Sequence, residues 1–176
     1  MILVTGATGN IGSEVAKHLK TKGESFLVST QGEIKDADRE RWMNFADRST
    51  FASALVGIKQ VFLMRPPNLT STEDIFEPFV EACVKANVDR IVFLSLLGAE
   101  NNFFVPHRKI EEVIISSGID YCFLRPSFFM QNLSTTHKQD IRELRELLVP
   151  AGHGRTSFID AKDIGEIGAL ILRQTN

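Results

Sequence analysis

The sequence is poor in the residues on which several classes of protein depend. It has two cysteines in 176 residues, Cys83 and Cys122, and they form neither a Cys-x-x-Cys pair nor a cluster with histidines. This pattern excludes a disulfide framework and a cysteine-rich zinc site. We expect both cysteines to be small core residues.

An excess of one charge and long apolar runs are missing as well. The 20 Lys and Arg side chains nearly balance the 22 Asp and Glu side chains, for a formal net charge of −2, and the two signs are interleaved along the chain. This balance does not indicate a nucleic-acid partner, which needs a basic surface. No apolar run reaches the length of a membrane span and no basic leader precedes the first strand, so we expect a soluble, cytoplasmic protein without a membrane partner.

The chain does contain a regular alternation of short apolar runs and helical patterns. The apolar runs predict strands near residues 1–5, 25–30, 41–45, 60–65, 89–95, 121–125 and 156–159. Residues 61–64 and 91–94 are apolar without alternation, as in strands that are covered on both faces of a parallel sheet. We therefore predict one domain over residues 1–176, an α/β fold with a doubly wound parallel sheet that binds its ligand at the carboxyl ends of the strands.

Capping chemistry indicates where several helices begin and end. The predicted caps are Ser49 or Thr50 for a helix through Val56, Ser71 or Thr72 for one reaching about Ala86, Pro106 for one ending before Gly118, and Asp160 for one through Arg173. The mixed charges of residues 138–146 predict a solvated helix face.

A glycine-rich turn, Thr5-Gly6-Ala7-Thr8-Gly9-Asn10-Ile11-Gly12, joins the first strand to an amphipathic helix that runs to Lys22. Unpaired backbone amides at such a helix start bind a diphosphate without a cationic side chain. We expect Gly6 to permit the tight exit from the strand, Gly9 to let the backbone approach phosphate, and Gly12 to let the helix pack closely on the sheet. The spacing is one residue longer than Gly-x-Gly-x-x-Gly, so the alternative is an ordinary strand-turn-helix loop.

This glycine-rich block resembles the opening of the short-chain dehydrogenase/reductase superfamily, in particular its atypical NmrA-like branch with NAD(P)H-dependent quinone reductases. The stretches 57–67, 86–95, 117–132 and 158–164 resemble further parts of that branch, in family order and over nearly the whole chain. The resemblance implies a Rossmann-type fold and an NAD(P) cofactor. Members of the branch usually continue past the last helix, so the substrate part at the carboxyl end is expected to be short or missing, either through truncation or because the natural product is short.

Cofactor choice is expected at the end of the second strand, where an acidic residue would bind an adenosine ribose and repel a 2′-phosphate. The residues there are Ser29, Thr30 and Gln31, and Lys35 and Arg39 follow. The lack of a carboxylate and the two cations favour NADP(H) over NAD(H). The alternative is that both cations simply lie on a mobile loop.

The family pattern adds positions for the rest of the cofactor. Relatives often place an arginine at the end of the second strand, which this chain lacks, and an aspartate where this chain has Asn44. Arg65, which two prolines follow, is expected to border the nicotinamide ribose or else to form a surface ion pair. The predicted cofactor-binding residues are Gly6, Thr8, Gly9, Asn10, Ile11, Gly12, Ser29, Thr30, Asn44, Phe45, Arg65 and Ser95.

Ordinary members of the superfamily use a tyrosine with a lysine four residues later as an acid/base pair. The single tyrosine, Tyr121, lies in a predicted strand and is followed four residues later by Arg125, so the pair is absent. This argues against epimerase and ordinary alcohol dehydrogenase chemistry. It allows reduction of an acceptor for which solvent supplies the proton.

Three residues are candidates for catalysis. Ser95 ends the fifth strand at the rim, where its hydroxyl either meets a substrate oxygen or caps the next loop. Lys109 resembles a lysine that related reductases use near the cofactor, and the alternative is a solvated surface lysine. His107 has the ordinary pKa range for proton donation, although its helix position gives no further support.

An apolar wall is also predicted. Phe103, Phe104, Phe128, Phe129 and Met130 either line a pocket for an apolar acceptor or belong to the core. If the carboxyl-terminal part is missing, some of them should be exposed.

The residues thus predict an NAD(P)H-dependent reductase of a small apolar acceptor, either a quinone or an activated double bond. A non-catalytic redox sensor that acts through a regulatory protein partner is the alternative, because it needs the same nucleotide motif and no Tyr-Lys pair. A third possibility is a domain that binds cofactor and does nothing else.

Overall fold

A computed structural model describes residues 1–67, 69, 71–147 and 154–174. The central sheet has six parallel strands in the order β3-β2-β1-β4-β5-β6. These strands are β1 (Ile2–Val4), β2 (Phe26–Thr30), β3 (Glu40–Trp42), β4 (Gln60–Met64), β5 (Arg90–Leu94) and β6 (Asp120–Leu124). This is the strand order of doubly wound dinucleotide-binding folds, with its switch point between β1 and β4. The predicted fold class is confirmed.

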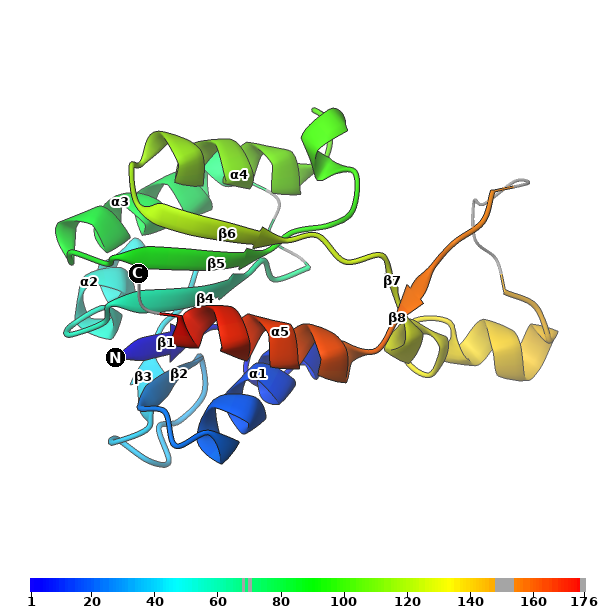
Figure 1. The fold of residues 1–176 in the computed structure, drawn as a ribbon, viewed down its shortest axis with the longest axis horizontal. Coiled ribbons are helices and arrows are strands. Elements are labelled where there is room, and N and C mark those ends of the chain that lie inside the picture. The colour runs from blue at the N-terminus through cyan, green and yellow to red at the C-terminus, as the bar shows by residue number, and fades with distance from the viewer. Residues whose placement is uncertain (68, 70, 148–153, 175–176) are drawn as a thin grey trace.

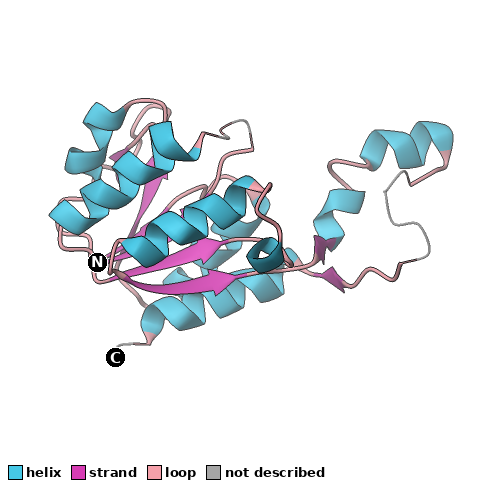
Figure 2. Ribbon diagram, turned by 90° about the horizontal axis from the view of Figure 1, so that it is seen from above, coloured by secondary structure: helices cyan, strands magenta, loops and turns pink. Residues whose placement is uncertain are grey.

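Helices cover both faces of the sheet (Figures 1 and 2). The helices α1 (Asn10–Thr21) and α5 (Ala161–Arg173) pack on one face, and α2 (Phe51–Ala54), α3 (Glu77–Lys85) and α4 (Pro106–Ser116) pack on the other. Because successive side chains of a strand point to opposite faces, neighbouring residues of β4 enter different cores. Val61 and Leu63 lie in the core beneath α3 and α4, and Phe62 lies in the core beneath α1 and α5.

The two cores are packed in different ways. Four phenylalanine rings, those of Phe45, Phe51, Phe76 and Phe79, meet in the first core with centroids 5.2–6.2 Å apart. In the second core α5 lies directly on α1. A Cβ added to Gly165 would lie 2.5 Å from Cβ of Glu14, so glycine is what lets the two helices approach so closely.

Most of the predicted helix boundaries are confirmed. The side chains of Ser71 and Asp160 accept hydrogen bonds from Asp74 N and Lys162 N, and Pro106 is the first residue of α4. Thr50 is the N-cap residue of α2, one of the two predicted, but its side chain makes no capping hydrogen bond to the helix. Asp47 caps the 3-10 turn Arg48–Thr50 that precedes α2, and its carboxylate accepts from Ser49 N at 3.0 Å.

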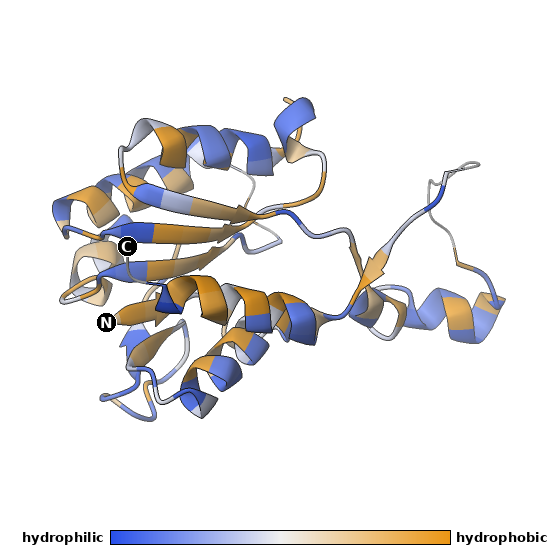
Figure 3. Cartoon of the chain, in the orientation of Figure 1, coloured by the Kyte–Doolittle hydropathy of each residue, from blue (hydrophilic) through white to orange (hydrophobic). Residues whose placement is uncertain are grey.

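An arm, which we define as residues 128–147 and 154–159, projects from the carboxyl edge of the sheet beyond the end of β6 (Figure 1). It contains a separate two-stranded parallel sheet of β7 (Phe128–Phe129) and β8 (Phe158–Ile159) and a π-helical turn over Asp140–Leu144. The strand predicted at 156–159 is therefore β8, outside the central sheet, and β7 was not predicted. Apolar and polar residues are mixed along the arm (Figure 3).

The two cysteines lie where the sequence places them, Cys83 fully buried and Cys122 half-buried against the core beneath α5. Burial raises the pKa of the Cys83 thiol to about 12. Within the described part of the chain, no helix has both the length and the apolar character needed to cross a membrane.

Candidate cofactor and acceptor site

A cavity of about 560 Å³ opens at the carboxyl edge of the sheet, where β1 and β4 end. This is the switch point, the place at which open α/β sheets bind ligands. The lining residues are Gly6, Thr8, Gly9, Ser29, Thr30, Gln31, Gly32, Met43, Phe45, Met64, Arg65, Pro66 and Pro67. Seven of the predicted cofactor-binding residues therefore line one cavity: Gly6, Thr8, Gly9, Ser29, Thr30, Phe45 and Arg65.

The glycine-rich turn is anchored by a residue that sequence reasoning passed over. The buried hydroxyl of Thr5 donates to Phe62 O at 3.0 Å and accepts from Met64 N at 2.8 Å, which ties the start of the turn to β4. Gly6 follows with φ +65°, a conformation that favours glycine. The signal for Thr5 was its place between a buried strand and the first glycine.

Gly12 and Gly9 have different reasons for being glycine. A Cβ on Gly12 would lie 2.3 Å from Gly6 O, so the close approach is to the turn itself and not, as predicted, to the sheet. A Cβ on Gly9 would meet Gly6 O at 3.4 Å, which is an ordinary contact, and φ is −89° there. The fold therefore does not need glycine at position 9.

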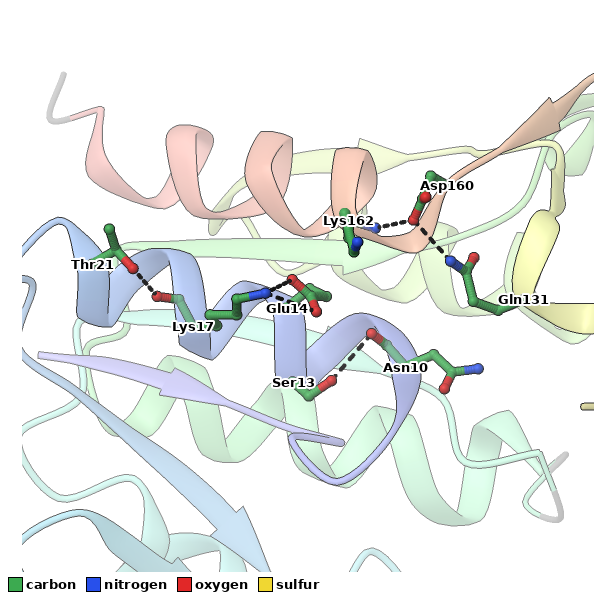
Figure 4. Close-up of polar contacts among 8 residues, drawn as sticks. All are labelled: Asn10, Ser13, Glu14, Lys17, Thr21, Gln131, Asp160 and Lys162. Carbon is green, nitrogen blue, oxygen red and sulfur yellow. Dashed lines mark hydrogen bonds and ion pairs between the residues drawn. The ribbon is translucent and has the colours of Figure 1, made fainter. Parts of the chain in front are cut away.

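The start of α1 leaves backbone amides free. Gly9 is the N-cap residue and, within the part of the chain described, no side chain caps this helix start. The amides of Asn10, Ile11 and Gly12 therefore have no intrahelical partner and carry partial positive charge. The Ile11 side chain is buried in the core, so this residue offers its backbone alone, and the Asn10 side chain points away from the helix (Figure 4).

The end of β2 presents no charged side chain to the cavity. Ser29, Thr30 and Gln31 line the cavity, and Thr30 Oγ1 accepts from Gly32 N at 3.1 Å. Arg39, one of the two cations that follow β2, does not line this cavity. Arg39 lies 3.6 Å from Asp36 in an ion pair and lines a separate cavity with the residues that precede β2, because the loop turns it back toward the amino end of the strand.

Asn44 and Phe45 contribute in different ways. Phe45 is buried, lines the cavity and belongs to the phenylalanine cluster of the first core. Asn44 does not line the cavity, and its Oδ1 accepts from Ala46 N at 3.0 Å, so its side chain is engaged by its own turn. Its predicted contact with the adenosine stays a prediction.

Arg65 lines the cavity but turns its guanidinium onto its own loop. Its Nη1 donates to the carbonyl oxygens of Pro66, Pro67 and Leu69 at 3.2, 3.2 and 2.9 Å. No ion pair is recorded for it among the described residues, in contrast to the surface ion pair considered from the sequence. Burial lowers the pKa of Arg65 from its ordinary value. The folded-back side chain stiffens the loop beside the cavity.

Beyond this loop, Ser95 lies at the end of β5 and next to a buried carboxylate. Ser95 is 4 % exposed, and its backbone N–H donates to Leu124 O of β6 at 2.8 Å. The hydroxyl lies close enough to Glu111 to help lower the pKa of that carboxyl, yet Oγ has no well-formed hydrogen bond to any described residue. Ser95 does not line the cavity at the switch point, so its predicted cofactor contact stays a prediction.

Glu111 is a second residue that sequence reasoning missed. It is 0 % exposed on α4, and its carboxylate accepts from Arg125 Nε at 2.9 Å and Nη2 at 2.8 Å. Burial raises the pKa of Glu111, but the hydrogen bonds from Arg125, the nearby Ser95 hydroxyl and the charges of Arg125 and Arg108 outweigh burial and lower it. A carboxylate at helical spacing from His107 and Ile114, on the apolar stripe of the helix, was the available signal.

His107 lies one helical turn before Glu111 and stacks on Phe93, with ring centroids 6.0 Å apart. The sequence predicts that His107 has the ordinary pKa range for proton donation, and this prediction is wrong. Burial and the charge of Arg65 lower the pKa of His107 to about 4, against a smaller opposite effect of Glu111. At neutral pH the ring is therefore uncharged and does not carry the spare proton of an imidazolium.

Lys109 does not lie beside the cofactor cavity, and the expectation of that placement is wrong. It is exposed and lines a groove of about 640 Å³ between α3 and α4. Because His107, Ile110 and Glu111 face inward, the helical period turns Lys109 outward. The groove has an apolar floor that includes Val80 and Val113.

The aromatic residues divide between wall and surface. Phe104 is 96 % exposed, Phe103 and Met130 are exposed, and Phe128 and Phe129 are half-buried. Phe128 and Phe158 pack edge to face at 5.2 Å in the arm. The exposure predicted for some of this set is confirmed, and a role as an acceptor wall stays a prediction.

Comparison with known proteins agrees with this geometry. A family model described as NAD(P)H-binding matches residues 6–150. The chain belongs to this NAD(P)H-binding family. The match includes the glycine-rich turn from Gly6 onward and all of the residues that line the cavity.

Curated relatives of this NAD(P)H-binding chain include several named oxidoreductases. Prestalk A differentiation protein A of Dictyostelium discoideum is 32% identical over 97% of this chain and 59% of its own length. The NAD(P)H azoreductase of Xenophilus azovorans is 31% identical over 98% of this chain and 63% of its own length. The uncharacterized oxidoreductase YesF of Bacillus subtilis is 30% identical over 97% and 60%. The chain thus spans about three fifths of the length of these relatives.

Solved structures share the fold. The NADPH-dependent quinone oxidoreductase of Escherichia coli, complexed with NADPH, matches with a TM-score of 0.85 and 22% identity, over 100% of this chain and 66% of its own. The Citrobacter sp. triphenylmethane reductase, complexed with NADP(H), matches with a TM-score of 0.83 and 20% identity, over 99% and 66%. These neighbours share the Rossmann-type fold that the resemblance implied.

Proposed function

We propose that the protein is an NAD(P)H-dependent reductase of a small apolar acceptor, either a quinone or an activated double bond. The observation that carries the proposal is the cavity at the switch point, which joins the uncapped start of α1 to the ends of β2 and β4. The names of curated relatives, an azoreductase among them, support a reductase rather than an epimerase. The absence of a Tyr-Lys pair supports the same choice.

The residues of the cavity fit a dinucleotide. The amides of Asn10, Ile11 and Gly12 would hold the diphosphate, and the free space at Gly9 would let it approach the backbone. A bound, reduced nicotinamide would supply the hydride. The chain's own contribution is to fix the cofactor on the glycine-rich turn and to hold the acceptor near the ends of β4 and β5.

We further propose that NADP(H) is preferred over NAD(H). No carboxylate stands among Ser29, Thr30 and Gln31 at the end of β2, so nothing there repels a 2′-phosphate. The two structural neighbours with bound cofactor hold NADP(H) or NADPH. Because Arg39 is engaged elsewhere, Lys35 is the nearby cation that remains of the two considered from the sequence, and we expect a modest preference.

The test is calorimetry with NADPH and NADH on the wild type, on Gly9→Val and on Ser13→Ala. In Gly9→Val the side chain should keep the diphosphate away from the backbone amides. The loss of one or more hydrogen bonds to a charged diphosphate should weaken binding by roughly ten- to a hundredfold. Ser13→Ala, on the exposed side of the same helical turn, should bind as the wild type does. Since nothing in the fold requires glycine at position 9, Gly9→Val should unfold at a temperature close to that of the wild type.

Turnover is then measured as loss of NADPH absorbance with a panel of quinones and enals. Turnover that Gly9→Val abolishes would support the reductase. Tight cofactor binding with no turnover of any panel member would refute the reductase and leave the binding site standing. Absence of heat with either coenzyme would refute both.

A further inference from the structure

A groove of about 640 Å³ runs between α3 and α4, which lie side by side on one face of the sheet (Figure 1). Val80 and Val113 belong to its floor, and Val84 lies beside them with 44 % of its surface exposed. The groove shares no lining residue with the cofactor cavity at the carboxyl edge of the sheet. An apolar floor with charged sides is typical of a surface that another protein chain covers.

Three of the six charged side chains that line the groove are already paired on their own helices. The carboxylate of Glu81 lies 3.8 Å from Lys85 Nζ, and that of Glu112 lies 2.9 Å from Arg108 Nε. The other three form no ion pair with any described residue, and they are Glu73, Glu77 and Lys109. All three are exposed, so their charges are available to a second molecule.

The unpaired charges lie at the same end of the groove. Glu73 and Glu77 are four residues apart where the chain enters α3, and Lys109 lies in the first turn of α4. Because β4, β5 and β6 are parallel, α3 and α4 run in the same direction and begin at the same end of the groove. The helix dipole disfavours a cation in the first turn, and no acidic residue stands in that turn to compensate Lys109.

These charges are complementary to those of a second copy of the same groove. A two-fold axis along the groove places α3 of one copy on α4 of the other, with both helices in the same direction. Lys109 of each copy then faces Glu73 and Glu77 of the other, and the valines of the two grooves meet beside them. We propose that the chain forms a two-fold dimer through this groove, in which Lys109 pairs with Glu73 and Glu77 of the other copy.

A second copy fits better than a partner of one charge. A basic segment would pair with Glu73 and Glu77 but would be repelled by Lys109, and an acidic segment would do the reverse. A copy of the chain satisfies all three, and each contact occurs twice because a two-fold interface is self-complementary. The dimer does not depend on the proposed reductase, since the groove and the cofactor cavity have no residue in common.

The first experiment measures the dimer by sedimentation equilibrium of the full chain at low ionic strength, over a range of concentrations. Lys109→Glu should raise the dissociation constant by roughly ten- to a hundredfold, because two attractions become two repulsions. Glu73→Lys combined with Glu77→Lys should have the same effect. Lys138→Glu makes the matching change of charge on the arm and should leave the dissociation constant unchanged. Added salt should weaken the wild-type dimer.

The second experiment restores the complementary charges in a mixture of two variants. Lys109→Glu is mixed with the double variant Glu73→Lys/Glu77→Lys, one of them labelled with nitrogen-15 so that native mass spectrometry identifies the mixed dimer. Each variant alone should be monomeric at concentrations where the wild type is a dimer. In the mixed dimer both contacts again join opposite charges, so its dissociation constant should return to that of the wild type.

Circular dichroism checks that both variants are folded, as substitutions of exposed side chains should allow. A wild type that is monomeric at every concentration would overturn the proposal and leave the groove to another partner or to none. A dimer that tolerates both charge reversals would overturn it as well, because that dimer would use another surface. Folded variants whose mixture forms no dimer would overturn the pairing of Lys109 with the two glutamates.

Discussion

Gln131 and Asp160 are joined by a hydrogen bond of 2.8 Å from Gln131 Nε2 to Asp160 Oδ1 (Figure 4). Both side chains also cap α5, since Gln131 Oε1 accepts from Ala161 N and Asp160 Oδ1 accepts from Lys162 N, each at 2.9 Å. Two free amides of the helix start are therefore satisfied, one of them from the arm. The root of the arm and the start of α5 are held as one unit.

Gln131→Ala should lower the free energy of unfolding by roughly 1–2 kcal/mol, because two hydrogen bonds are lost and Ala161 N–H is left unpaired. The pKa of Asp160, which the backbone of Lys162 and the side chain of Gln131 lower, should move back toward its ordinary value. Urea unfolding and carboxylate NMR measure the two effects. Gln139→Ala, which removes an exposed bond to Glu143, is the control, and equal effects of both variants would contradict the assignment.

The contact between α5 and α1 gives a steric prediction. A Cβ on Gly165 would lie 2.5 Å from Glu14 Cβ and 2.9 Å from its carbonyl carbon, so Gly165→Ala must push the helices apart. Overpacking of this kind costs about 1–3 kcal/mol, against up to about 1 kcal/mol gained in helix propensity. A lower thermal midpoint for Gly165→Ala, with little change for the exposed neighbour Glu166→Ala, is the expected result. An unchanged thermal midpoint for Gly165→Ala would contradict the close contact between the two helices.

Local signals in the sequence were sufficient for the central fold. The apolar runs of β4 and β5 and the glycine-rich turn each consist of consecutive residues. Each can be recognised from the hydrophobic period or the φ requirement of a few neighbouring residues. These signals placed all six strands of the sheet and the residues at the switch point. The cap at Asp47 was missed because several neighbouring polar residues can act as caps with equal sequence support.

Contacts between residues that are distant in the sequence could not be predicted from it. Glu111 and Arg125 lie 14 positions apart, and a glutamate on an otherwise apolar helix face is unremarkable until its partner is known. The two-residue strand β7 is too short to show a period, and β8 pairs with it rather than with the central sheet. The directions of Arg39 and Lys109 depend on a loop path and a helix rotation that composition does not specify.

The buried pair of Glu111 and Arg125 predicts a pH-dependent loss of stability. Arg125→Met would leave the carboxylate of Glu111 buried without its partner, which costs about 3 kcal/mol or more at neutral pH. The pKa of Glu111, lowered in the wild type, would then rise, because burial would be opposed only by Ser95 and the charge of Arg108.

The sign follows from the two protonation states. In the wild type the lowered pKa stabilises the fold above the unfolded value of 4.5, and this contribution is lost as the pH falls through the folded value. In Arg125→Met the raised pKa destabilises the fold as the pH rises. The difference between the two proteins in urea unfolding should therefore be largest near neutral pH and shrink on acidification. Glu111→Leu combined with Arg125→Met should recover part of the loss, and a pH-independent difference would contradict this account.

The neutral state of His107 has its own consequence for stability. Its pKa is about 4 in the fold and 6.5 when unfolded, so between these values the unfolded chain binds a proton that the folded chain does not. Stability should consequently fall as the pH is lowered from 6.5 toward 4. Because the ring is only partly buried, solvent screening reduces the effect to about 1–2 kcal/mol.

Urea unfolding of the wild type and of His107→Gln over this pH range measures the contribution. The variant has no imidazole at this position to protonate, so its stability should fall less steeply on acidification, and the two curves should converge toward pH 4. His18→Gln removes a histidine outside the site and should keep the contribution of His107. Parallel curves for the wild type and His107→Gln would show that the ring is not held neutral by burial and the charge of Arg65.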